Sequence, residues 1–233
     1  MPTCPAKHAV LIALLIAGAA CTSRGGNEAP DAGRADAAPP PRIIPARVSA
    51  PGELLADVDS SKISLSIVKD GNTKFPVTAV VLLRDGRVTL GGPAPSARLS
   101  IDLTTFDSSM PLRNERVKQF FFETNNKNME TAELVIPSLP ADAVAALQSA
   151  RRASHVKLDG ELTLHGQKKP IALVVDAAYE PGGTLVIRSS APIDLNVNDY
   201  GMIDNLRRLS LICKHDSIEE IIKVEATIEL PVK

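Results

Sequence analysis

Alternation of apolar and polar side chains with a period of two is the feature that most constrains this chain. In residues 62–68 (KISLSIV), Ile63, Leu65 and Ile67 fall on one face of an extended segment, and two serines fall on the other. Successive side chains of a β-strand point to opposite faces, so this pattern is typical of a strand that is buried on one side. The same alternation recurs in residues 98–103, 156–164 and 224–230. The chain is therefore expected to fold mainly as half-buried strands.

Short runs rich in β-branched residues predict further strands between those segments. They cover residues 76–83, 87–90, 132–136, 171–177 and 184–187. Turn signals close several of these runs, at Asp85-Gly86, residues 91–93, His165-Gly166 and residues 181–183. Roughly eight to ten antiparallel strands with few helices imply a sandwich or a closed barrel, and strand patterns alone do not choose between the two.

Two segments break the alternation and are expected to be helical. Residues 138–152 (SLPADAVAALQSARR) are rich in alanine, with a proline and an acid near the start and two arginines at the end, which suits the helix dipole. Residues 114–122 (NERVKQFFF) are expected to begin with a helical turn that has Asn114 as its N-cap, and to continue as extended chain. The prediction is thus an all-β fold with one or two short helices.

The first 20 residues have the pattern of a secretory signal. A lysine and a histidine precede the unbroken apolar run at residues 9–20 (AVLIALLIAGAA). That run of 12 residues is too short for a bilayer core, which needs about 20. Small residues stand directly before Cys21, an arrangement that resembles a bacterial lipoprotein box, in which the cysteine becomes the lipidated first residue.

The mature chain is expected outside the cytoplasm. Thr22, rather than an aspartate, follows Cys21, and by the same resemblance this favours the outer membrane, with the domain facing the periplasm. The alternative is a secreted or periplasmic protein with an unmodified Cys21. Residues 21–52 are rich in Ala, Gly and Pro and are expected to form a flexible tether. The folded domain is then residues 53–233, in which Cys213 has no disulfide partner.

Charge and residue usage exclude several classes of function. Lys plus Arg number 26 and Asp plus Glu 27, so the net charge is −1 and no general basic field exists to gather nucleic acid. Aromatic residues make up only 3% of the chain, and the four histidines have no zinc-binding helical spacing. No nucleophile elbow and no phosphate-binding glycine loop is present. We therefore expect no enzymatic activity, no cofactor and no metal.

One pair of chemically reactive side chains has a role that the preceding arguments do not cover. Cys213 and His215 are two residues apart, and a thiol beside an imidazole can act as a nucleophile or as half of a metal site. The two side chains share a face only if this segment is extended, and the sequence places no third ligand or acid beside them. A structural role for the pair is therefore favoured.

Four segments resemble, in order, motifs of the YceI-like family. Residues 162–171 (LTLHGQKKPI) resemble the family's hairpin, and residues 112–122 (LRNERVKQFFF) its charged stretch followed by paired Phe. Residues 193–201 (IDLNVNDYG) resemble its late strand end, and residues 57–67 (DVDSSKISLSI) its first strand. Three residues depart from the pattern: Arg116-Val117 stand where the family commonly has His-Leu, and Val197 stands where it has Arg.

The resemblance implies a lipocalin-like antiparallel β-barrel that encloses an apolar tunnel. In that family the tunnel binds a polyisoprenoid chain, such as a quinone or prenyl lipid, so storage or transport of a long apolar lipid in the envelope is expected. A barrel of about eight strands can hold one slender ligand, and apolar area alone can retain it. The alternative is a packed barrel without a ligand, an envelope module whose exterior binds a protein partner. In both cases we expect a monomer, because barrel closure removes free strand edges.

The candidate ligand-binding residues lie in or near these motifs. They are Arg113, Asn114, Phe120, Phe121, Phe122, His165 and Tyr200. The three phenylalanines either line the tunnel or plug the barrel end as core. The ring of His165 either contacts ligand or bonds backbone groups across its turn, and Lys168 and Lys169 are expected in solvent. Tyr200 is expected to end a strand, with Gly201 supplying a turn.

Overall fold

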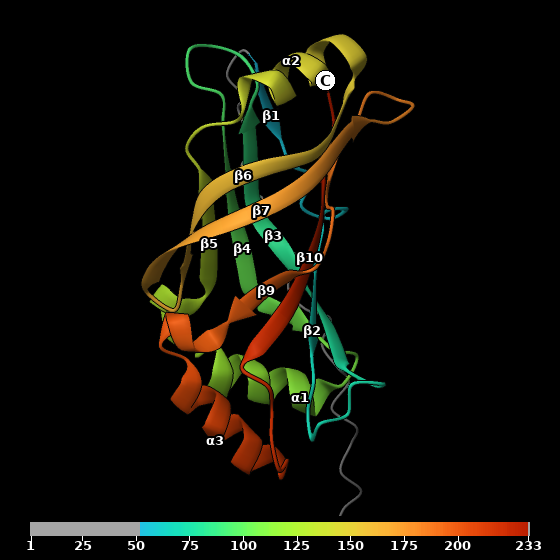
Figure 1. Ribbon diagram of the computed structural model, residues 1–233. Helices are drawn as coiled ribbons and strands as arrows, with labels where there is room; N and C mark the ends of the chain where they lie inside the picture. Colours follow the sequence, from blue (N-terminus) through green and yellow to red (C-terminus); the bar gives the residue numbers. More distant parts are fainter. Residues whose placement is uncertain (1–51, 233) are drawn as a thin grey trace, which may run out of the picture. The chain divides into compact units, whose positions relative to one another are not determined.

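The computed structural model describes residues 52–232, which form a closed antiparallel barrel (Figure 1). The strands are β1 (Glu53–Leu55), β2 (Lys62–Ile67), β3 (Val77–Thr89), β4 (Ser96–Asp107), β5 (Thr131–Ile136), β6 (Arg152–Leu164), β7 (Gln167–Tyr179), β8 (Leu185–Ser189), β9 (Ile193–Asn196) and β10 (Ile221–Leu230). Eight of them form the ring β3-β2-β10-β8-β7-β6-β5-β4, and pairing of β4 with β3 closes it. The predicted all-β barrel is confirmed, and the pairings exclude an open sandwich.

Strand β10 is hydrogen-bonded along both of its edges. One edge pairs with β2, where Val224 faces Leu65. The other edge is shared, because Ile228 pairs with Ile187 of β8 and Ile222 pairs with Leu195 of β9. Residues 190–192 separate β8 from β9, and they include a proline, which has no N–H to donate to a ladder. Strand β1 pairs with β3 outside the ring.

Helices cover the two ends of the barrel. Helix α2 (Ala141–Ala150) lies at one end, and α1 (Pro111–Arg116) and α3 (Ile203–Cys213) lie at the other (Figure 1). Three short turns complete the set: the π-helix η1 (Val117–Phe121) and the 3-10 helices η2 (Lys127–Met129) and η3 (Val197–Tyr200). Within residues 52–232, no helix combines the length and the apolar character needed to cross a membrane.

The helices confirm part of the prediction and correct the rest. Helix α2 lies inside the expected segment and ends at Arg151, which has the left-handed φ of 56°. The expected helix at residue 114 begins earlier, at Pro111, with Met110 as its N-cap, and it continues as the π-helix η1 rather than as extended chain. Asn114 is therefore not an N-cap. Helix α3 was not predicted, and it brings the helices to three.

Strand β3 is continuous where the sequence predicted two strands and a turn. Asp85 and Gly86 lie inside it, and the pairing with β4 shifts register between Leu83 and Asp85. A Cβ on Gly86 would lie 2.7 Å from the Cβ of Ala56. The glycine therefore allows close packing at a bulge and does not mark the end of the strand.

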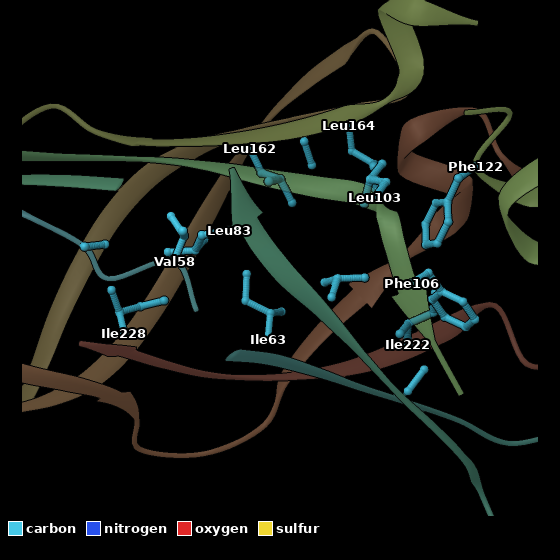
Figure 2. Close-up of a cluster of buried hydrophobic side chains, with 14 of the residues drawn as sticks. Val58, Ile63, Leu83, Leu103, Phe106, Phe122, Leu162, Leu164, Ile222 and Ile228 are labelled. Carbon is cyan, nitrogen blue, oxygen red and sulfur yellow. The ribbon is translucent and has the colours of Figure 1, made fainter. Parts of the chain in front are cut away.

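The barrel interior is filled by the inward faces of the strands near its middle. Leu83, Leu185 and Leu230 are fully buried. Figure 2 shows part of this cluster, with Leu103 of β4 and Leu164 of β6 next to the ring of Phe122. The period-two pattern accounts for this packing, because each strand contributes one apolar face.

Candidate functional site

The larger of two apolar cavities in the described barrel, the main cavity, lies under helix α2. Its volume is about 170 Å³. Every strand of the ring contributes to its wall, and α2 with the residues before it contributes Leu139, Ala143, Val144 and Leu147. The strand side chains that form most of its wall are aliphatic, among them Leu99, Ile101, Leu134, Leu158, Leu173 and Ile187.

The lining of the main cavity has almost no polar chemistry. Ser189 supplies the single side-chain hydroxyl, and its Oγ already accepts a hydrogen bond of 3.1 Å from the backbone N–H of Ala226. No charged and no aromatic side chain is among the lining residues. Such a surface binds mainly by removing apolar area from water.

A second apolar cavity, the helical-end cavity, lies between the strands and helices α1 and α3. Its volume is about 90 Å³, and its wall includes Phe106, Phe121 and Phe122. The rings of Phe121 and Phe122 lie 4.9 Å apart, and Phe106 meets Phe122 edge-on at 5.8 Å. Lys69, Arg113, Cys213 and His215 also line this cavity. It therefore combines an apolar wall with cationic groups.

The two cavities are separate compartments of one barrel. They share no lining residue. Figure 2 shows Leu103 and Leu164 between Leu162, which lines the main cavity, and the rings of Phe106 and Phe122, which line the helical-end cavity. Leu103 and Leu164 are 5% and 6% exposed and line neither cavity. In this structure the tunnel is therefore interrupted.

The predicted ligand-binding residues gather at the helical end. Arg113, Phe121 and Phe122 line the helical-end cavity, and none of the seven lines the main cavity. Phe121 and Phe122 are buried core, as one of the two readings expected, and they also form part of the wall of the helical-end cavity. The ring of Phe120 is half-buried beneath the Arg208 guanidinium, 4.8 Å from it.

Asn114 holds the turn between β4 and α1. Its Oδ1 accepts hydrogen bonds from the N–H of Ser108 at 2.8 Å and from the Ser108 hydroxyl at 2.7 Å, and its Nδ2 donates to Asp107 Oδ1 at 2.8 Å. The N–H of Ser109 and the Asn114 amide lower the pKa of Asp107. The observed contacts of Asn114 thus join two segments of backbone.

His165 and Tyr200 occupy the same end of the barrel. His165 Nε2 lies 3.0 Å from Glu123 Oε2, so its main partner is a side chain and not the backbone bond across the turn that was expected. Tyr200 is buried at the end of η3 rather than of a strand, and its burial raises the pKa of its hydroxyl. Gly201 has φ 68° and supplies the expected turn.

Cys213 and His215 have different hydrogen-bond partners. The Sγ of Cys213 lies 3.9 Å from Nη1 of Arg116, whereas Nδ1 of His215 lies 2.9 Å from Asp70 Oδ2. The backbone N–H of Ser217 and the His215 side chain lower the pKa of Asp70. Among residues 52–232 no three His, Cys, Asp or Glu side chains are grouped as a metal site. Lys168 and Lys169 are exposed, as expected.

The resemblance implied an apolar tunnel, but sequence reasoning named none of the residues that line the main cavity. The alternation of each strand predicts which face points into the barrel. It does not predict whether the side chains on that face fill the interior completely. Small residues on those faces, such as Ala97, Ala177 and Ala226, are the pattern that could have located free volume. Their effect depends on which strands are neighbours, and no single segment shows it.

Comparison with known proteins identifies the family of this chain and solved structures with a similar fold. The family model described as the YceI-like domain matches residues 56–230. A polyisoprenoid-binding domain from Saccharophagus degradans superposes with a TM-score of 0.64 at 20% identity, over 78% of this chain and 99% of that chain. BcnA of Burkholderia cenocepacia superposes with a TM-score of 0.53 at 17% identity, over 75% of this chain and 98% of that chain.

A search of curated protein sequences found no match. The two superpositions support the fold alone, since both identities are below 25%. The family match covers every strand of the closed ring, from β2 to the end of β10. The chain therefore belongs to the family of proteins with a YceI-like domain.

Proposed function

We propose that this protein binds a long apolar lipid of the polyisoprenoid or quinone class in the main cavity, and that it stores or carries this lipid in the bacterial envelope. The observation that supports the proposal is the lining of the main cavity, which is aliphatic apart from Ser189 and Pro140. The similar fold of the polyisoprenoid-binding domain from Saccharophagus degradans favours the same class of ligand.

The energetics suit a tail without polar groups. Each buried methylene contributes about 0.8 kcal/mol, so a few isoprene units offset the cost of ordering the ligand. A charged or hydrogen-bonding tail would lose its water contacts, and only the Ser189 hydroxyl could replace them. The cavity therefore selects for hydrocarbon, and the protein acts as a binding protein rather than an enzyme.

The location in the envelope rests on the N-terminal sequence. The signal at residues 1–20, Cys21 and the tether to residue 52 lie outside the described residues, except for Gly52. We propose that Cys21 is lipidated and holds the barrel at the outer membrane, on the periplasmic side. The tether lets the barrel meet lipid that enters or leaves the membrane surface.

Native mass spectrometry of the protein purified from its own host tests the proposal. We expect a bound prenyl lipid or quinone that solvent extraction releases and identifies. An empty protein would contradict the proposal and would favour the alternative, a packed module that binds a protein partner through its exterior.

A matched pair of variants in β7 locates the site. Ala177 lines the main cavity and is 5% exposed, whereas Ala172 lies on the outer face of the same strand. Ala177→Leu should reduce the lipid that copurifies, because the added methylenes fill the cavity, and Ala172→Leu should not. Thermal unfolding measures the stability that Ala177→Leu loses through overpacking, which we expect to be about 1–3 kcal/mol. Equal lipid content in two folded variants would place the ligand elsewhere.

A further inference from the structure

Cationic side chains without acidic partners surround the helical-end cavity. Among residues 52–232, the Arg113 guanidinium has no hydrogen-bond or ion-pair partner, and Lys69 Nζ has only His215 Nε2, at 3.5 Å. Asp70, which pairs with the lining residue His215, already accepts hydrogen bonds from His215 and from the N–H groups of Asp216 and Ser217. Lys69 and Arg113 therefore line the cavity without a carboxylate at ion-pair distance among the described residues.

Burial distinguishes these cations from others on the barrel. Arg98 and Arg188 are exposed and are paired with carboxylates, at 2.6 Å to Glu133 and 2.9 Å to Glu180. Other cations without a carboxylate partner, such as Lys157, are exposed to solvent. Arg113 and Lys69 instead are half-buried and line an apolar cavity.

The residues that line the helical-end cavity differ in how deeply they are buried. Lys69, Arg113 and His215 are half-buried, whereas Phe121, Phe122 and Ile222, which line the same cavity, are buried. A ligand that enters from the side of the cations would place an anionic head among them and its chain against the rings. Charge-assisted hydrogen bonds to Arg113 and Lys69 would then hold the head.

We propose that the helical-end cavity is a second ligand site, which binds an amphipathic anion with one short acyl chain and a carboxylate head. It is distinct from the main cavity, which has no charged lining residue and lies beyond Leu103 and Leu164. Its volume of about 90 Å³ is roughly half that of the main cavity, so it suits a shorter chain. The inference stands whether or not the main cavity holds an isoprenoid.

Cys213 provides a local reporter, because its thiol lines this cavity and is the free cysteine of the described residues. Alkylation of Cys213 by iodoacetamide can be followed in the full chain by peptide mass spectrometry. Decanoate, below the concentration at which it forms micelles, should slow the reaction severalfold in a saturable manner. Decanol, which has the same chain without the charge, should require roughly tenfold higher concentration, since a hydrogen bond to a charged group contributes about 1.5–3 kcal/mol.

Two arginine variants distinguish specific binding of the anionic head in this cavity from a general attraction of anions to positive charge on the protein. Arg113→Gln should raise the decanoate concentration for half-protection roughly tenfold and leave protection by decanol unchanged. Arg207→Gln removes the same charge from an exposed position on α3, where Arg207 pairs with Asp204, and should change neither. Thermal unfolding confirms that both variants fold.

Equal protection by decanoate and decanol, or equal effects of the two variants, would overturn the carboxylate site. Absence of protection by both probes would overturn the cavity as a ligand site. None of these results depends on whether lipid copurifies with the main cavity, so failure here and failure of the isoprenoid proposal remain distinguishable.

Discussion

The Nε2 atom of His165 lies 3.0 Å from Oε2 of Glu123, and this contact joins the turn between β6 and β7 to the segment after η1. Both residues have left-handed backbone, with φ of 49° and 55°, a conformation that non-glycine residues seldom adopt. Asn205 of α3 donates to the carbonyl of Phe121 at 3.0 Å, so the helix is fixed to the same segment. The pair thus helps to hold the helical end of the barrel together.

Replacement of His165 by alanine should lower the free energy of unfolding by about 1 kcal/mol, because one partly buried hydrogen bond is lost. Urea denaturation measures the change. His155→Ala is the control, since the His155 side chain is 81% exposed and lies 3.6 Å from its acidic neighbour Asp176. Equal losses in the two variants would show that the Glu123 contact does not stabilise the fold.

Asn114→Ala should destabilise the protein by about 1–2 kcal/mol at neutral pH, since the N–H and hydroxyl of Ser108 lose their acceptor. The variant should also raise the pKa of Asp107 toward its ordinary value, because one of the groups that lower it is removed. Carboxyl titration by NMR measures this shift. Asn128→Ala, at an exposed position, should leave the pKa of Asp107 unchanged.

The same variant predicts a change in acid stability. A carboxyl whose pKa is lowered in the folded state stabilises the fold above its unfolded pKa, and this contribution is lost as the pH falls from that value through the folded pKa. Asp107 has an ordinary value of 3.8 and a lower folded value. Between about pH 5 and pH 2, Asn114→Ala should therefore lose less stability than the unmodified protein. An unchanged slope in this range would contradict the assigned coupling.

Gly160→Ala should destabilise the barrel by about 1–3 kcal/mol, because an added methyl has no room between β6 and β5. A Cβ on Gly160 would lie 2.9 Å from the carbonyl oxygen of Val135 and would also meet the side chain of Ile136. Gly91→Ala is the control, because there the nearest atom, the Cα of Gly52, is 3.5 Å away. Chemical denaturation should show a clearly lower free energy of unfolding for Gly160→Ala than for Gly91→Ala.

Cys21→Ala should move the protein from the membrane fraction to the soluble fraction of host cells. The reason is that the proposed lipid anchor would be lost. Cell fractionation followed by immunoblotting measures the distribution. Unchanged fractionation would contradict lipidation at this cysteine, and Cys213→Ala controls for the loss of a thiol.

Strand segments with regular alternation were predictable, whereas the continuity of β3 across its irregular pairing with β4 was not. Strands β2 and β10 follow the period of two, which placed Ile63, Leu65 and Ile228 on the inner face. Gly86 was wrongly interpreted as a turn, because a glycine required for close packing and a glycine required for a turn look alike in sequence. Only the approach of Ala56, which depends on tertiary structure, distinguishes them.

Helix α3 shows a second limit of sequence reasoning. Leu206 and Leu209 are buried at helical spacing, and Ile203 and Cys213 extend the same face. This signal was present but competed with the resemblance of the preceding residues to a strand end. The cavities were harder still to predict from the sequence, because their walls combine residues from β2 through β10 and their volume depends on how completely the side chains pack.

The double pairing of β10 has a consequence for how the protein is made. Of the eight strands in the ring, β10 is synthesised last, yet it supplies partners for both β2 and β8. Until residues 221–230 have left the ribosome or crossed the translocation channel, those two strands keep unpaired backbone groups that can recruit other chains. We therefore expect a chain released by a ribosome that stalls shortly before residue 221 to be prone to aggregate, because β2 and β8 would lack their β10 partner.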